Sequence, residues 1–109
     1  MQIYNRQAAL ALLEDDKGLL SILEQSFLSE NKFEKDVIEK LVTENKTAEA
    51  ASYVHATKGA ARQLCMEKLQ DSAQKLEDVL RGKKNGSIKS LTDKMAADYK
   101  EAIKAIEEN

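Results

Sequence analysis

The chain has 109 residues, a hydrophobic fraction of 42% and a formal net charge of −2, with acidic and basic residues interspersed along it. This length predicts one domain over residues 1–109, and the mixed charge argues against a nucleic-acid partner, which a basic surface would indicate. No apolar run is long enough to span a bilayer, so no membrane partner is expected either.

Apolar residues then recur at helical spacing along the whole chain, which contains no proline and only four glycines. The first residues lack the basic and apolar blocks of a signal peptide, which predicts a cytoplasmic protein. A short entry helix is predicted over Asn5–Glu14. A second helix follows Asp16, whose side chain can cap it, and a third spans Phe33–Val42.

A fourth helix is predicted to begin at Thr47, as its cap, and to contain the only histidine, His55. The next helix spans Met66–Leu80 and stops near Gly82, and a last helix follows the turn at residues 82–87. Short connections of this kind favour an all-α fold, an antiparallel four-helix bundle with an additional short N-terminal helix. The short helices are expected to pack at one end.

The histidine helix divides into two faces when residues are placed about 100° apart. The face predicted to be buried holds Ala50, Val54, Thr57, Ala61, Leu64 and Cys65, and the last of these is read as a small core residue. His55, Lys58, Gly59 and Arg62 fall on the other face, beside the small residues Ala48, Ala51 and Ser52.

A glycine inside a helix costs about 1 kcal/mol relative to alanine, so Gly59 indicates that another molecule must approach this face closely. An exposed neutral imidazole is a nucleophile near pH 7, and Lys58, one turn from His55, can pair with anionic oxygens. The electrophile that fits best is a phosphoryl group. A metal site is not indicated, because one histidine and one cysteine on different faces do not make one. A hydrolase is not indicated either, because no carboxylate is predicted to orient the imidazole of His55.

These residues resemble the histidine-containing phosphotransfer (HPt) domains of multistep phosphorelays. That family's pattern is matched by His55, Lys58, Gly59, Ala60, Ala61 and Leu64, and in the next helix by Leu69, Leu76 and Glu77. The chain departs from this pattern in two places. Thr57 replaces the usual leucine, and Cys65 with Met66 replaces the usual glycine and alanine at the helix end.

The resemblance implies a phosphocarrier without kinase activity that needs no cofactor of its own. His55 would accept a phosphoryl group on Nε2 from a receiver domain of a hybrid histidine kinase and pass it to the aspartate of a response regulator, with Mg²⁺ on the receiver. Lys58 would stabilise the transferred group. Gly59 would keep the docking surface clear, with Arg62, Gln63 and Ala51 as candidates for its rim. The carrier is expected to be a monomer.

Two other functions stay open from the sequence. The same face could bind a receiver without accepting phosphate, in which case His55→Gln would still bind and still function. Alternatively, the chain could be a structural bundle in which His55 is incidental, and no receiver would bind. The basic run of Arg81, Lys83, Lys84 and Lys89 is interpreted as a solvated turn.

Overall fold

The computed structural model describes residues 1–108, and these contain six helices and no strand. The helices are α1 (Arg6–Leu12), α2 (Lys17–Glu30), α3 (Lys35–Thr43), α4 (Thr47–Gln63), α5 (Glu67–Leu80) and α6 (Ile88–Glu107). The molecule is elongated, with extents of 43 × 23 × 20 Å. The predicted all-α bundle is confirmed.

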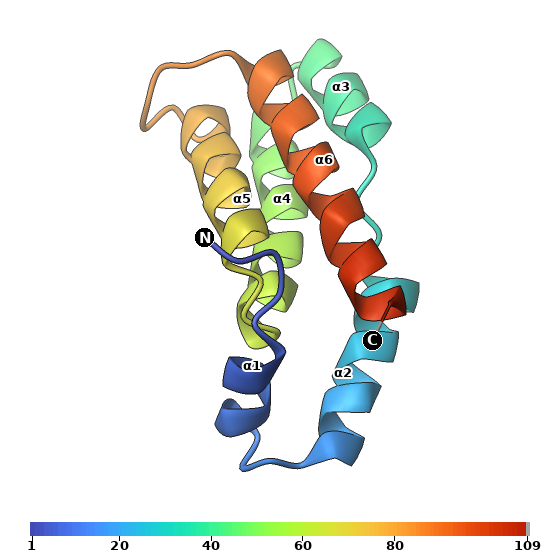
Figure 1. Ribbon diagram of the computed structural model, residues 1–109. Coiled ribbons are helices and arrows are strands. Elements are labelled where there is room, and N and C mark those ends of the chain that lie inside the picture. Colours follow the sequence, from blue (N-terminus) through green and yellow to red (C-terminus); the bar gives the residue numbers. More distant parts are fainter. Residues whose placement is uncertain (109) are drawn as a thin grey trace.

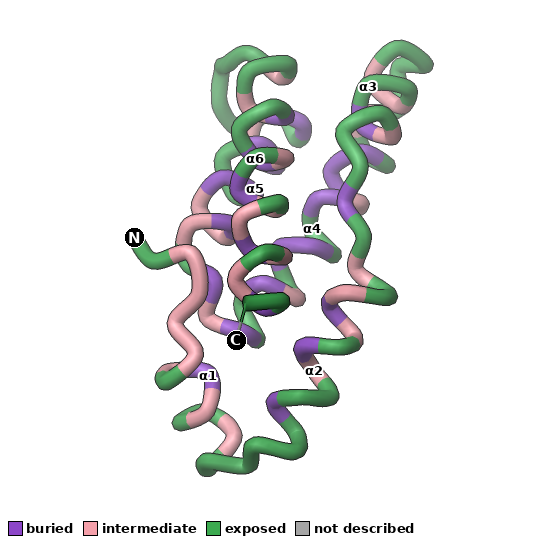
Figure 2. Tube along the Cα trace, turned by 45° about the vertical axis from the view of Figure 1, so that its right-hand side comes forward, coloured by how far each residue is buried: buried purple, intermediate pink, exposed green. Residues whose placement is uncertain are grey.

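Three long helices, α4, α5 and α6, run side by side along the molecule and alternate in direction (Figure 1). The fourth position of the bundle is shared by α2 and α3, which follow one another along the same edge (Figures 1 and 2). Of the two short helices, α1 lies at one end and α3 at the other. The expectation that they pack at one end was therefore wrong.

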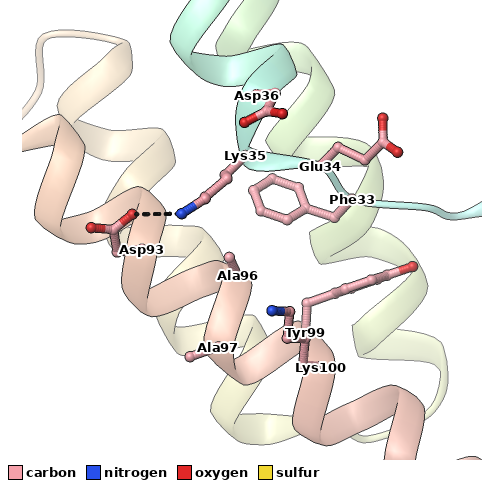
Figure 3. Close-up of a pocket in the computed structure, with 9 residues that line it drawn as sticks. All are labelled: Phe33, Glu34, Lys35, Asp36, Asp93, Ala96, Ala97, Tyr99 and Lys100. Carbon is pink, nitrogen blue, oxygen red and sulfur yellow. Dashed lines mark ion pairs between the residues drawn. The ribbon is translucent and has the colours of Figure 1, made fainter.

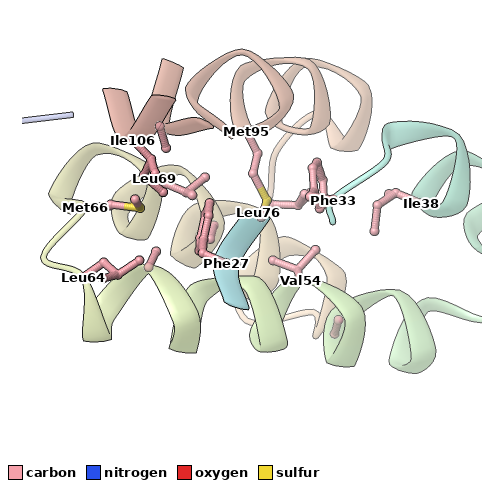
Figure 4. Close-up of a cluster of buried hydrophobic side chains, with 14 of the residues drawn as sticks. Phe27, Phe33, Ile38, Val54, Leu64, Met66, Leu69, Leu76, Met95 and Ile106 are labelled. Carbon is pink, nitrogen blue, oxygen red and sulfur yellow. The ribbon is translucent and has the colours of Figure 1, made fainter. Parts of the chain in front are cut away.

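The core runs along the axis of the bundle and receives apolar side chains from every helix. Its largest fully buried members are Phe27, Leu20, Ile38, Leu64, Met66, Leu69, Leu76, Met95 and Val54, and several of these are seen in Figure 4. Thr57 is buried among them, as the sequence predicted. Burial of this apolar surface is the main force that holds α4 in place.

Helix starts follow local capping chemistry. The side chain of Asp16 accepts a hydrogen bond from the backbone of Leu19 and caps α2, as predicted. Asn5 caps α1 in the same way. For α4, the cap position is Lys46, without a side-chain cap bond, and Thr47 is already helical. The predicted Thr47 cap was one residue off.

The ends of α1, α3, α4 and α5 share a backbone motif in which the residue after the C-cap has a positive φ. At the end of α5 this residue is Gly82, with φ 75°, and the amide of Lys83 bonds to the carbonyl of Asp78. At the end of α4 it is Cys65, with φ 55°. A non-glycine residue is strained in this conformation, and the family resemblance places a glycine there. Cys65 is half-buried, so it lies at the helix exit and not inside the core.

Candidate functional site

His55 lies in the middle of α4, on the side next to α5. Its imidazole is 60% exposed, so the ring is open to a partner molecule. Its helix is fixed from behind by fully buried apolar residues, among them Val54 and Ala61. The exposed ring therefore stands on a rigid support, which is the arrangement that precise positioning of a reactive group requires.

Glu77 of α5 reaches across to the imidazole. Its carboxylate oxygens lie 3.1 Å (Oε2) and 3.3 Å (Oε1) from Nδ1 of His55. No carboxylate was expected from the sequence to orient this ring, and that expectation was wrong. The two residues are 22 positions apart on different helices, and only the packing of α4 against α5 brings them together.

Two cations complete this group. The ammonium of Lys58 is 2.8 Å from Oε1 of Glu77, and the Nε of Arg81 is 2.8 Å from Oε2. We call His55, Lys58, Glu77 and Arg81 the charged hub. Lys58 also donates a hydrogen bond of 2.9 Å to the side-chain oxygen of Gln74. The carboxylate of Glu77 is only 7% exposed, and its three partners supply the hydrogen bonds that a buried charge needs.

The protonation state of the hub follows from these contacts. Burial would raise the pKa of Glu77, but the hydrogen bonds from Lys58, Arg81 and His55 outweigh it and lower that pKa to about 2. Near neutral pH, Glu77 is therefore ionised and can only accept hydrogen bonds. Nδ1 of His55 must then carry the proton that it donates, which leaves the lone pair of the neutral ring on Nε2. Within residues 1–108, no hydrogen bond to Nε2 is present.

Gly59 lies one turn after His55, on the exposed surface of α4. A Cβ added at this position would meet no atom within 4 Å. The fold therefore does not need a glycine here, although a glycine lowers helix stability by about 1 kcal/mol. Arg62 and Gln63, the other two exposed candidates for the rim, lie on the last turn of the same helix.

Two residues that the sequence placed on the exposed face are buried. Ala51 is fully buried, so its predicted place on the rim of a docking surface was wrong. Lys58 is 8% exposed, and its ammonium is held by Glu77 and Gln74. Both residues lie on the flank of α4 that α5 covers, and a single helix does not reveal where its neighbours pack.

Glu77 and Arg81 are the members of the hub that sequence reasoning did not assign to the site. Glu77 follows Leu76 at the edge of the apolar face of α5, and a carboxylate in such a place needs a partner when it is buried. Arg81 lies four residues later, at the spacing of an ion pair on a helix. The spacing of Glu77 and Arg81 was therefore the feature of the sequence that could have indicated a charged cluster.

A groove of about 530 Å³ lies between the start of α3 and the middle of α6 and contains no member of the charged hub (Figure 3). Among residues 1–108, no cluster of three histidine, cysteine, aspartate or glutamate side chains could hold a metal ion. In the same range, no helix is long and apolar enough to cross a membrane.

The arrangement also bears on hydrolytic chemistry. A Ser-His-acid triad needs a serine hydroxyl bonded to Nε2 of the histidine. Ser52 is the nearest serine along α4, but among the described residues it makes no hydrogen bond to His55. Glu77 thus orients the imidazole of His55, and Nε2 of the ring faces solvent.

The chain matches the model of a known protein family. The model of a protein family described as the Hpt domain matches residues 22–109, most of the chain, and this range includes the whole charged hub. No curated protein and no solved structure matches the chain.

Proposed function

The chain belongs to the Hpt domain family and so has a phosphotransfer role in two-component phosphorelay, and we propose that His55 is its phosphoacceptor. In this proposal, Nε2 takes a phosphoryl group from the aspartate of one receiver domain and passes it to the aspartate of another. The carrier is a cytoplasmic monomer without kinase activity of its own. Its partners are receivers of a hybrid histidine kinase or of response regulators.

The observation that carries the proposal is the contact between Nδ1 of His55 and the ionised carboxylate of Glu77. Because Nδ1 donates its proton inward, the nucleophilic lone pair of the ring is on the nitrogen that faces a partner. The same carboxylate holds the ring in one orientation. An oriented ring with an open Nε2 is what a histidine nucleophile requires.

The proposed transfer is a nucleophilic displacement at phosphorus. The Nε2 lone pair forms a bond to the phosphorus of the aspartyl phosphate, and the bond between phosphorus and the aspartate oxygen breaks, so the carboxylate leaves with the electron pair. The ring, protonated at Nδ1 and phosphorylated at Nε2, is then a cation that Glu77 stabilises. In the second transfer, a new aspartate oxygen attacks phosphorus and Nε2 recovers its lone pair.

Charge on the phosphoryl oxygens has to be offset on both sides of the interface. The receiver is expected to hold the Mg²⁺ that does so on its side. On this side, Lys58 and Arg81 bring two positive charges against the single negative charge of Glu77. From the sequence, Lys58 was predicted to contact the phosphoryl group directly. While its ammonium is bound to Glu77 and Gln74, Lys58 acts on the phosphorylated ring only indirectly, by holding Glu77 in place.

The docking surface is the exposed face of α4 around His55. Gly59 provides a clear approach, and Arg62 and Gln63 remain candidates for its rim. Gly59→Leu should fold normally, since there is space at this position, yet it should block transfer from a receiver. Its reaction with phosphoramidate, a small phosphoryl donor, should stay normal because that donor needs no docking.

The test is phosphoryl transfer to the wild type and to His55→Gln, both from phosphorylated receivers of the source organism and from phosphoramidate. We expect acid-labile, base-stable label on the wild type alone. Label on His55→Gln would show that another residue is the phosphoacceptor. Receiver binding without label on the wild type would favour the binding module, and a folded wild type that neither binds nor reacts would favour the structural bundle.

A further inference from the structure

Beside the charged hub, the end of α5 and the turn after it present three basic residues to solvent. Arg81 is the C-cap residue directly after α5, and Lys83 and Lys84 follow Gly82. We call Arg81, Lys83 and Lys84 the basic wall. The side chain of Lys84 is 71% exposed and that of Arg81 is 36% exposed, so these charges are available to a partner.

The basic wall is tied to the site by two sets of contacts. Arg81 Nε and His55 Nδ1 both contact Oε2 of Glu77, at 2.8 Å and 3.1 Å, so these nitrogens are at most about 6 Å apart. On the other side, Lys84 lies 3.8 Å from Asp78, Asp78 accepts a hydrogen bond from Gln74, and Gln74 accepts one from Lys58. The wall therefore lies beside the contacts between α4 and α5 that orient the imidazole.

The backbone fixes the wall in this position. The amide of Gly82 bonds to the carbonyl of Val79 at 3.0 Å, and the amides of Lys83 and Lys84 bond to the carbonyl of Asp78 at 2.8 Å and 3.4 Å. With the positive φ of Gly82, these bonds form a closed helix end. The lysines thus start from a defined backbone next to the hub.

The charge of the wall contrasts with that of the chain. Its three cations lie beside two acids, Asp78 and Glu77, which leaves a net charge of +1. Lys58, which also pairs with Glu77, raises the net charge of this group to +2, whereas the whole chain has a net charge of −2. Lys89, which the sequence grouped with these residues, lies on α6 and pairs with Asp93 at 3.3 Å. A net positive charge therefore lies beside His55.

We propose that the basic wall is an electrostatic docking element that guides the acidic rim of a receiver's phosphoryl site onto His55. This inference rests on the proposed function. A receiver must present an aspartate and the carboxylates that hold a divalent cation, and hard cations are bound by such oxygens. The protein face that approaches Nε2 is therefore acidic, and a basic surface beside the target nitrogen raises the rate of productive encounter.

The test is the second-order rate constant for transfer from a Mg²⁺-loaded phosphoreceiver that labels the wild type, measured from about 20 mM to about 500 mM salt. The double variant Lys83→Glu/Lys84→Glu should be about tenfold slower at low salt and approach the wild type at high salt. A milder variant, Lys83→Gln/Lys84→Gln, should fall between them. The control Lys100→Glu/Lys104→Glu makes the same charge change on α6 and should alter the rate less than about twofold.

Phosphoramidate separates docking from chemistry. We expect the two double variants at Lys83 and Lys84 to react with phosphoramidate at the wild-type rate at high salt, because they keep His55 and Glu77. Equal loss with phosphoramidate and with the receiver would overturn the docking role, as would a wild-type salt dependence in Lys83→Glu/Lys84→Glu. A wild type that no receiver labels would instead defeat the proposed function, and this inference with it.

Discussion

On one flank of α4, Tyr53 packs into an aromatic cluster with Phe27, Phe33 and Tyr99, and on the other flank His55 joins the charged hub. Ring centroids in the cluster are 5.7 to 6.0 Å apart, which is favourable aromatic packing. Both regions join α4 to neighbouring elements, but the polar atoms of their rings bind different partners.

In the aromatic cluster, the hydroxyls bond to the chain that links α2 to α3. Tyr53 donates to the carbonyl of Lys32 at 3.1 Å and accepts from the amide of Glu34 at 2.9 Å, and Tyr99 donates to the carbonyl of Asn31 at 3.0 Å. In the hub, the contacts around Glu77 leave Nε2 of the imidazole free for a ligand. We therefore expect the cluster to govern stability and the hub to govern phosphotransfer.

Among variants that keep His55, the largest effect on phosphotransfer is expected for Glu77→Gln. The amide cannot offset the charge on the phosphorylated ring, and it leaves the buried ammonium of Lys58 without its counter-charge. Transfer from phosphoramidate should slow about a hundredfold, or about 3 kcal/mol in barrier. The matched control is Glu67→Gln on the exposed first turn of α5, which should react normally. Equal rates for the two variants would remove Glu77 from the mechanism.

The reverse pattern is expected for Phe33→Ala. Removing this buried ring, which contacts both tyrosines of the cluster, should lower the free energy of unfolding by about 4 kcal/mol. Urea unfolding measures this loss. Under conditions where the variant is fully folded, its rate with phosphoramidate should match the wild type. A slower reaction in the folded variant would show that the two flanks of α4 are coupled.

Acid should also distinguish the two regions. The pKa of Glu77 is lowered to about 2 in the folded protein, below its ordinary value of 4.5. Its contribution to stability is therefore complete above about pH 4.5 and is lost as the pH falls towards 2. Between these values, the wild type should lose roughly 2 kcal/mol more stability than Glu77→Gln. Phe33→Ala should instead follow the pH dependence of the wild type, since that variant keeps the hub. Urea unfolding at several pH values checks both.

The same contrast explains what could be predicted from the sequence. Apolar periodicity identified every helix, because each must bury one face, and it placed Thr57 in the core. It could not show which flank of α4 the next helix covers, so Ala51 and Lys58 were expected to be exposed. The contact between His55 and Glu77 depends on how α4 and α5 are aligned along their length. That alignment is set by core packing between them and leaves no short-range pattern.

The backbone conformation of the helix ends was likewise predicted only in part. Gly82 was correctly read as the end of a helix, since glycine adopts a positive φ easily. Cys65 has a positive φ as well, without the residue type that signals it. The sequence also could not show whether Gly59 fills a need of the fold, which depends on the space around it.

The smallest effect is expected for Gly59→Ala. Nothing lies within 4 Å of the added methyl group, and alanine favours the helix by about 1 kcal/mol, so the free energy of unfolding should rise by about that amount. Because no side chain of the charged hub lies within 4 Å of the added methyl group, the rate with phosphoramidate should not change. Transfer from a receiver should slow modestly, since the methyl group enters the docked surface. Thermal unfolding and the two transfer rates measure these effects. A more stable variant with unchanged receiver transfer would show that the glycine serves neither the fold nor docking.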